Sequence, residues 1–159
     1  MLLNNIFKII GGLGAIIVLT GATSLQPKEE RQAQNKLPQI NEGVWQVLAK
    51  NKVHLDEAKG EYSVIFTGET KALDKTEVTI KGFMLPLDPA EKFTHFILST
   101  RTPTCYFCPP GGPTEIIDVT VNKPVSWNED IVTVKGTFGF MKNKELGLFF
   151  KLGNATIIN

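Results

Sequence analysis

The stretch of sequence that decides the fold is VTIKGFMLPL, residues 78–87. Val78, Ile80 and Gly82 alternate there with polar residues, and a period of two predicts a strand with one buried face. A glycine inside a strand marks a bulge or a tight coil, which lets a sheet curl on itself. A later strand pattern contains Gly136 in the same way. The two glycines therefore favour a small closed barrel over an open sheet.

Other short strand patterns lie along the chain, separated by turn residues such as Asp88-Pro89 and Gly153-Asn154. They are predicted at Val64 to Phe66 and over residues 93–100, 115–121, 131–140 and 146–158. We therefore predict a mainly β fold, namely a five- to six-stranded antiparallel barrel like the oligonucleotide/oligosaccharide-binding fold. An open sandwich is the alternative.

A short helix is predicted before these strands. Ile40, Val44 and Leu48 recur at a spacing of four, which predicts a helix over residues 42–50. Trp45 is predicted to fill the core where this helix packs on the sheet. Four later aromatic residues are also expected to lie mostly in the core and not on a binding face: Phe138, Phe140, Phe149 and Phe150.

Length, charge and motifs limit the class of protein. The chain has 159 residues, 42% of them hydrophobic, which suffices for one globular domain. Its net charge is +1 and it has few arginines, so no basic stripe is available to neutralise the phosphates of a nucleic acid. Neither G-x-S-x-G nor H-E-x-x-H occurs in the sequence. We therefore predict neither an enzyme nor a nucleic-acid-binding protein.

The N-terminal residues 1–22 have the layout of a secretory signal peptide. An apolar run over residues 9–19 follows Lys8, and small residues come next, so cleavage is expected after Ala22 or Ser24. The alternative is an uncleaved N-terminal membrane anchor. No cysteine lies near this exit, which excludes a lipid anchor at the site. In either case the domain is expected to be exported from the cytoplasm.

Two further segments complete the predicted organisation. Residues 23–39 contain Lys, Glu, Gln, Asn and Pro with almost nothing to bury, and they are predicted to be a flexible polar linker. Residues 40–159 are predicted to form the single barrel domain.

Strand patterning does not explain STRTPTCYFCPPGGPTE, residues 99–115. Cys105 and Cys108, the two cysteines of the chain, have a C-x-x-C spacing that suits a disulfide, half of a metal site or a redox dithiol. Export to an oxidising compartment favours the disulfide. A redox role is disfavoured because no helix can begin in the residues that follow: Pro109, Pro110, Gly111, Gly112 and Pro113. This stiff loop is predicted to be the functional surface.

A metal site in this loop needs further ligands, because two cysteines supply two of the four that zinc takes. His95 in the strand before the loop and Glu115 at its end are the candidates, and zinc or copper is the metal that thiolates favour. His54 lies in a separate segment and is the weakest candidate. Each of these side chains also fits a solvated or locally hydrogen-bonded group.

Three motifs are shared with other bacterial proteins: G-F-M-L-P-L at residues 82–87, C-x-x-C-x-P-G-G-P-x-E at residues 105–115, and Trp-x-x-Leu at Trp45 and Leu48. With these motifs the chain resembles a bacterial family of exported proteins classed as a domain of unknown function. The resemblance implies a protein in the periplasm or attached to the outer face of the inner membrane. It also implies, from several relatives, a link to ATP-driven (ABC-type) export or metal-uptake systems. Many relatives are lipoproteins, and this chain lacks the lipidation cysteine.

Two functions of different classes follow. The first is a non-enzymatic accessory or binding protein that holds zinc or copper through the C-x-x-C loop and works with components of an envelope transport system. The alternative is a thiol-disulfide protein that uses Cys105 and Cys108. A third alternative is a structural protein-interaction module with a plain disulfide.

Overall fold

The computed structural model describes residues 32–87, 89–104 and 110–158. Both cysteines and the predicted leader over residues 1–22 lie outside these ranges. Within the three ranges, no helix is long and apolar enough to cross a membrane. The expectations for the leader and for the thiols therefore stay predictions.

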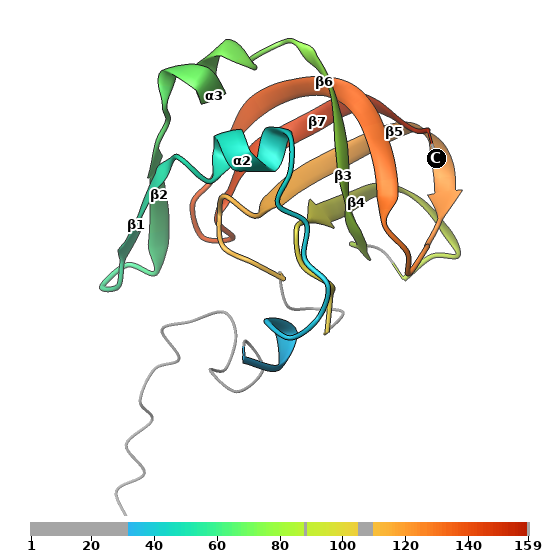
Figure 1. The fold of residues 1–159 in the computed structure, drawn as a ribbon, viewed down its shortest axis with the longest axis horizontal. Coiled ribbons are helices and arrows are strands. Elements are labelled where there is room, and N and C mark those ends of the chain that lie inside the picture. Colours follow the sequence, from blue (N-terminus) through green and yellow to red (C-terminus); the bar gives the residue numbers. More distant parts are fainter. Residues whose placement is uncertain (1–31, 88, 105–109, 159) are drawn as a thin grey trace, which may run out of the picture.

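Five strands form a closed barrel, which confirms the predicted fold class (Figure 1). Around the barrel they follow the order β3-β4-β5-β7-β6. Their bounds are β3 (Glu77–Pro86), β4 (Lys92–Ser99), β5 (Ile116–Ser126), β6 (Val132–Asn143) and β7 (Leu148–Ile157). The pairing is antiparallel except between β5 and β7, which run parallel.

Strand β3 closes the barrel because it has two neighbours. Its C-terminal half pairs with β4, where Phe83 lies opposite Ser99. Its N-terminal half pairs with β6, where Gly82 lies opposite Val132. The change of partner falls at Gly82, the glycine that the sequence pattern marks as a point of coiling.

The two strand glycines lie where a neighbouring strand leaves no room for a side chain. A Cβ atom placed on Gly82 would lie 2.5 Å from Cγ of Leu98, and one placed on Gly136 would lie 2.9 Å from Cβ of Ala155. Real Cβ atoms essentially never approach other heavy atoms this closely. Both positions therefore require glycine for space, as the barrel prediction demands.

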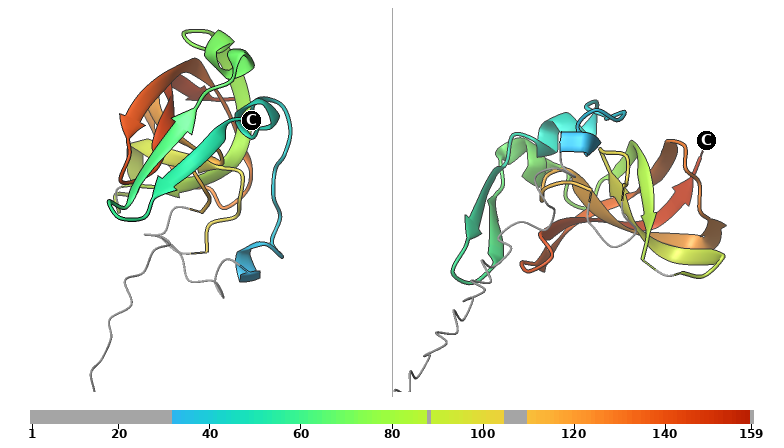
Figure 2. Two further views of the ribbon diagram at one scale, coloured as in Figure 1. Left: turned by 90° about the vertical axis from the view of Figure 1, so that its left-hand side faces the viewer. Right: turned by 90° about the horizontal axis from the view of Figure 1, so that it is seen from below.

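Smaller elements lie beside the barrel (Figure 2). They are the helices α2 (Val44–Leu48) and α3 (Gly68–Ala72) and an antiparallel pair of strands, β1 (Lys52–Asp56) and β2 (Glu61–Ile65). The predicted N-terminal helix is thus present but shorter than residues 42–50. It begins after Gly43, whose φ of 60° lies in a region that is not helical.

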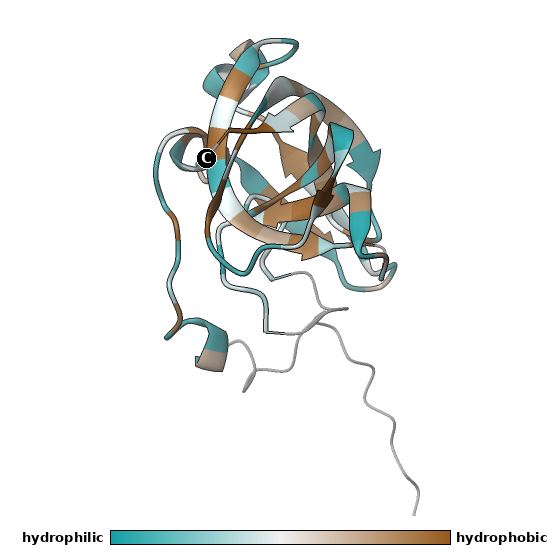
Figure 3. Cartoon of the chain, turned by 90° about the vertical axis from the view of Figure 1, so that its right-hand side faces the viewer, coloured by the Kyte–Doolittle hydropathy of each residue, from teal (hydrophilic) through white to brown (hydrophobic). Residues whose placement is uncertain are grey.

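The core fills the barrel and extends beneath α2. Trp45 is buried, and its indole Nε1 donates a hydrogen bond of 2.7 Å to the carbonyl oxygen of Lys81 on β3. This confirms Trp45 as a core residue. Hydrophobic and hydrophilic residues are interspersed along the barrel strands (Figure 3). Of the four predicted core aromatics, three are buried members of the core cluster, namely Phe138, Phe149 and Phe150, and the partly buried Phe140 packs against that cluster.

Candidate functional site

The C-x-x-C motif belongs to the connection between β4 and β5. Ser99 at the end of β4 pairs with Ile116 at the start of β5, so the connection leaves and re-enters the barrel at one point. We call residues 100–115 the cysteine loop. The structure describes its two flanks, residues 100–104 and 110–115. Two rigid strands therefore position the loop.

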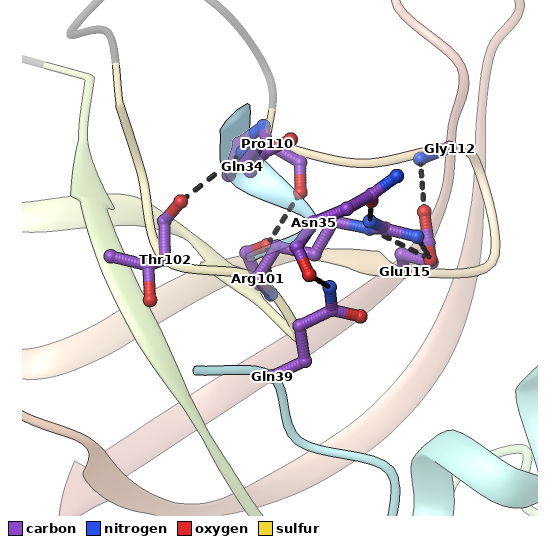
Figure 4. Close-up of polar contacts among 9 residues, drawn as sticks. Gln34, Asn35, Gln39, Arg101, Thr102, Pro110, Gly112 and Glu115 are labelled. Atoms are coloured by element: carbon purple, nitrogen blue, oxygen red, sulfur yellow. Dashed lines mark hydrogen bonds and ion pairs between the residues drawn. The ribbon is translucent and has the colours of Figure 1, made fainter. Parts of the chain in front are cut away.

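Glu115 fastens the two flanks to each other (Figure 4). Its Oε1 accepts hydrogen bonds from Nε and Nη2 of Arg101 at 2.9 and 2.6 Å. Its Oε2 accepts a bond of 2.7 Å from the backbone N–H of Gly112. The two side chains are 20% and 31% exposed, so water only partly screens this charged pair. Both carboxylate oxygens of a predicted metal ligand are thus already engaged inside the protein.

Ser99 provides a second fastening. Its hydroxyl donates a bond of 3.1 Å to the carbonyl oxygen of Pro110 and accepts one of 3.0 Å from the backbone N–H of Arg101. Ser99 and Pro110 are both buried. A buried hydroxyl that joins the first residues of one flank to the first described residue of the other limits how far they can separate.

The glycines of the loop permit this packing. A Cβ atom on Gly111 would lie 2.8 Å from Cβ of Glu115, so any larger residue would push the flank away from the carboxylate. Farther along, Pro113 packs near the β6–β7 turn, since a Cβ on Gly147 would lie 3.1 Å from Cγ of Pro113. Within the described flanks, the lack of a side chain at Gly111 and Gly147 therefore lets the protein's own residues approach closely.

A segment from the predicted linker reaches the same flanks. We call residues 34–40 the strap. Nε2 of Gln34 donates to the carbonyl oxygen of Thr102 at 3.1 Å, and Nη1 of Arg101 donates to Oδ1 of Asn35. The flexibility predicted for residues 23–39 stays a prediction, but these contacts were not foreseen from the composition of the segment.

His95 has a partner of its own. It lies in β4, about half exposed, and its Nε2 is 2.7 Å from Oδ2 of Asp118 on β5. Ser99 is four residues farther along β4, which corresponds to about 13 Å along a strand. The structure therefore engages His95 and Glu115 in separate interactions, and His54 belongs to β1, in another sheet.

The partner of His95, Asp118, was not predicted from the sequence. It follows two buried isoleucines, and nothing in the local pattern indicates that it faces a histidine 23 residues earlier. Pairing of β4 with β5 creates that contact. Among the described residues, no group of three or more His, Cys, Asp or Glu side chains is placed to hold a metal ion. A complete metal site without the cysteines is therefore not formed in this part of the chain.

Comparison with known proteins gives a family and no activity. Residues 23–148 match a family model described as "Protein of unknown function (DUF3299)". The crystal structure of a DUF3299 family protein from Pseudomonas aeruginosa PAO1 is 21% identical in sequence, with a TM-score of 0.49 over 84% of this chain and 83% of that chain. A comparison with curated proteins finds no match.

Proposed function

The chain belongs to the DUF3299 family of proteins of unknown function, and on that premise we propose that it is an exported, non-enzymatic accessory protein that binds zinc or copper(I) through its cysteine loop. The observation that supports this most is that hydrogen bonds of Ser99 and Glu115 hold both described flanks of the loop in place. Thiolates are soft ligands that favour these two ions. Supporting residues that hold a ligand loop in place reduce the entropy lost when a ligand binds.

The fastening leaves only a short span for the thiols. Thr102 is tied to the strap, and Pro110 is tied to Ser99, so seven residues, 103–109, separate the two fixed points. Cys105 and Cys108 belong to this span. Two thiolates supply half of a tetrahedral zinc site, and we propose that a partner of the envelope transport system or solvent supplies the rest.

Within this function, Glu115 supports the loop. Its two oxygens accept three hydrogen bonds from Arg101 and Gly112, and a metal would have to displace them. His95 is a further candidate ligand through its other ring nitrogen, Nδ1. Metal-binding histidines are often oriented by a carboxylate on the ring nitrogen that does not bind the metal, and Asp118 contacts Nε2 of His95 in this way. The pairing of Arg101 with Glu115 also reduces the positive charge that would stabilise a redox-active thiolate.

Metal titration of the reduced protein tests the proposal. We expect wild type to bind about one equivalent of zinc or copper(I), and Cys105→Ser and Cys108→Ser to lose this binding. His95→Ala should weaken binding only if that imidazole is a ligand, and His54→Ala is the matched control because it removes the other histidine of the chain. Equal uptake by wild type and Cys105→Ser would refute metal binding by the loop.

Counting free thiols in protein recovered from the cell envelope tests the alternative. If Cys105 and Cys108 form a disulfide that the reductants of the envelope do not reduce, the loop is a structural module. If the bond opens and closes with a partner, the thiol-disulfide function is correct.

A further inference from the structure

We propose that β1 is a dimerisation edge, at which two copies of the chain join their β1–β2 hairpins into one four-stranded antiparallel sheet. Among the described residues, β1 (Lys52–Asp56) pairs with β2 alone. The other side of β2 is attached to the barrel, because the backbone N–H of Tyr62 donates a hydrogen bond of 2.9 Å to the carbonyl oxygen of Lys144 in the β6–β7 turn. Strand β1 therefore lies on the outside, with β2 between it and the β6–β7 hairpin (Figure 2, left).

The outer edge of β1 has the form of a strand that can accept another strand. Lys52, Val53 and His54 are exposed, and the five residues contain no proline and pair with β2 without a shift of register. Every second residue of an antiparallel strand directs both its N–H and its C=O to the same side, so β1 presents donors and acceptors at this edge. A two-stranded sheet is only marginally stable by itself and gains from added strands.

The sequence of β1, KVHLD, is complementary to itself in the antiparallel direction. A two-fold axis through His54 places Lys52 opposite Asp56 of the second copy and Val53 opposite Leu55 of the second copy, and symmetry repeats each pair. Opposite charges and apolar side chains directly across from each other stabilise antiparallel strands. This register also joins residues an even number of positions apart, so the backbone groups that face outward on one copy meet those that face outward on the other.

The charges select this register and this direction. If the axis passes through Val53 or Leu55 instead, Lys52 has no acid opposite it, and parallel pairing brings the lysines of the two copies together. A lysine on an edge strand usually prevents pairing with another chain, but Asp56 converts this lysine into a specific contact. Asp56 is 3.5 Å from Lys59 within its own chain, and both side chains are exposed, so its carboxylate can also pair with a second cation.

The faces of the hairpin continue across such a dimer. Val53 and Leu55 lie opposite Val64 and Tyr62 of β2, which pack against the barrel core. Residues directly opposite each other share a face of the sheet, so Val53 and Leu55 lie on the barrel side. Val53 is 40% exposed, and Leu55 of the second copy would cover it. The polar side chains of β1 would remain on the solvent side.

Sedimentation equilibrium of the mature full chain tests the proposal, with a reductant and a metal chelator present so that neither a disulfide nor a shared metal links two cysteine loops. We expect wild type to dimerise with a dissociation constant of roughly 0.1 mM, because two five-residue strands make a small interface. Lys52→Asp and Asp56→Lys should each weaken dimerisation about tenfold, because each places like charges opposite each other at both symmetric pairs. The double variant K52D/D56K restores opposite charges and should dimerise within about threefold of wild type.

Lys123→Asp is the matched control, because Lys123 is exposed on β5 in the barrel and the substitution changes the net charge by the same amount. Hydrogen exchange locates the contact: exchange in a peptide covering residues 52–56 should slow as the protein concentration rises, and exchange in β5 should not. Thermal unfolding checks that each variant remains folded.

Three results would overturn the proposal: a wild type that stays monomeric at about 1 mM, a dimer in which exchange of β1 is unchanged, and a dimer that Lys52→Asp weakens but K52D/D56K does not restore. A monomer would leave the edge of β1 to an extended peptide of another protein. The cysteine loop takes no part in these measurements, so their outcome is independent of metal binding.

Discussion

At the scale of single residues, Glu115 illustrates how one carboxylate can look like a ligand in a sequence and act as a support in a structure. It was a candidate because it lies at the end of a cysteine-containing loop. Folding brings it against Arg101, 14 residues earlier, and one of its oxygens accepts two bonds from the guanidinium while the other accepts the Gly112 N–H. Sequence spacing cannot distinguish these roles, because both need an acid at the loop edge.

The first prediction concerns this carboxylate. Glu115→Gln should lower the free energy of unfolding by about 1–2 kcal/mol, because the variant loses charge-assisted bonds and leaves a partly buried Arg101 without its anion. Urea denaturation measures the change. Glu77→Gln is the matched control: Glu77 pairs with Lys135 at 2.7 Å but is 64% exposed, so its loss should change stability by less than about 0.5 kcal/mol. Equal effects of the two variants would contradict a supporting role for Glu115.

At the scale of elements, the barrel depends on strands that lack a side chain where a neighbouring strand leaves no room for one. Gly82 marks the switch of β3 between its two neighbours, and Gly136 lies where β6 meets β7. The periodicity of two predicted these strands because each has one face in the core. Closure of the barrel was predicted from the two glycines, because glycine is unfavourable inside a flat strand and indicates a point where the strand coils.

The second prediction tests closure at β6. Gly136→Val should lower the free energy of unfolding by about 1–3 kcal/mol or more, since a Cβ there would lie 2.9 Å from both Ala155 Cβ and the carbonyl oxygen of Gly153. Thermal unfolding measures the loss. Gly153→Ala is the matched control, because Gly153 lies in β7 and a Cβ there has open space. If Gly136→Val is as stable as wild type, the glycine does not serve closure.

The third prediction concerns the β6–β7 turn that borders the cysteine loop. Gly147 has a φ of 68°, and a Cβ on it would lie 3.1 Å from Pro113 and 3.3 Å from Tyr62. Gly147→Ala should therefore cost about 1–2 kcal/mol through backbone strain and crowding. Gly60→Ala separates the two causes, since Gly60 has a φ of 65° and open space around its Cβ. If chemical denaturation gives similar losses of unfolding free energy for Gly147→Ala and Gly60→Ala, crowding against Pro113 contributes nothing to the loss.

At the scale of the whole molecule, local patterns predicted the fold class, and pairing between distant segments produced what they missed. Strand β1, with the sequence KVHLD, was not predicted because it is mostly exposed and lacks a clear apolar face. The parallel pairing of β5 with β7 depends on the order of strands around the barrel, which no single stretch encodes.

The candidate site was predictable only in its location. The C-x-x-C spacing identified the loop, but the contact of Gln34 with Thr102 joins residues 68 positions apart. A polar linker composition gives no indication that one of its glutamines becomes buried. The supports of the loop therefore depend on contacts between distant segments, which no local sequence pattern encodes.

The last prediction concerns the N-terminal end of the mature protein. An apolar run over residues 9–19 followed by small residues should direct cleavage within a few residues of Ala22. Cleavage there leaves residues 23–33 ahead of the strap, a stretch that can extend up to about 40 Å, so processing should not disturb the strap contacts. Intact-mass measurement of protein recovered from the cell envelope checks this. A full-length mass would contradict cleavage and show an N-terminal anchor, which would keep the strap, and with it the cysteine loop, within that distance of the membrane.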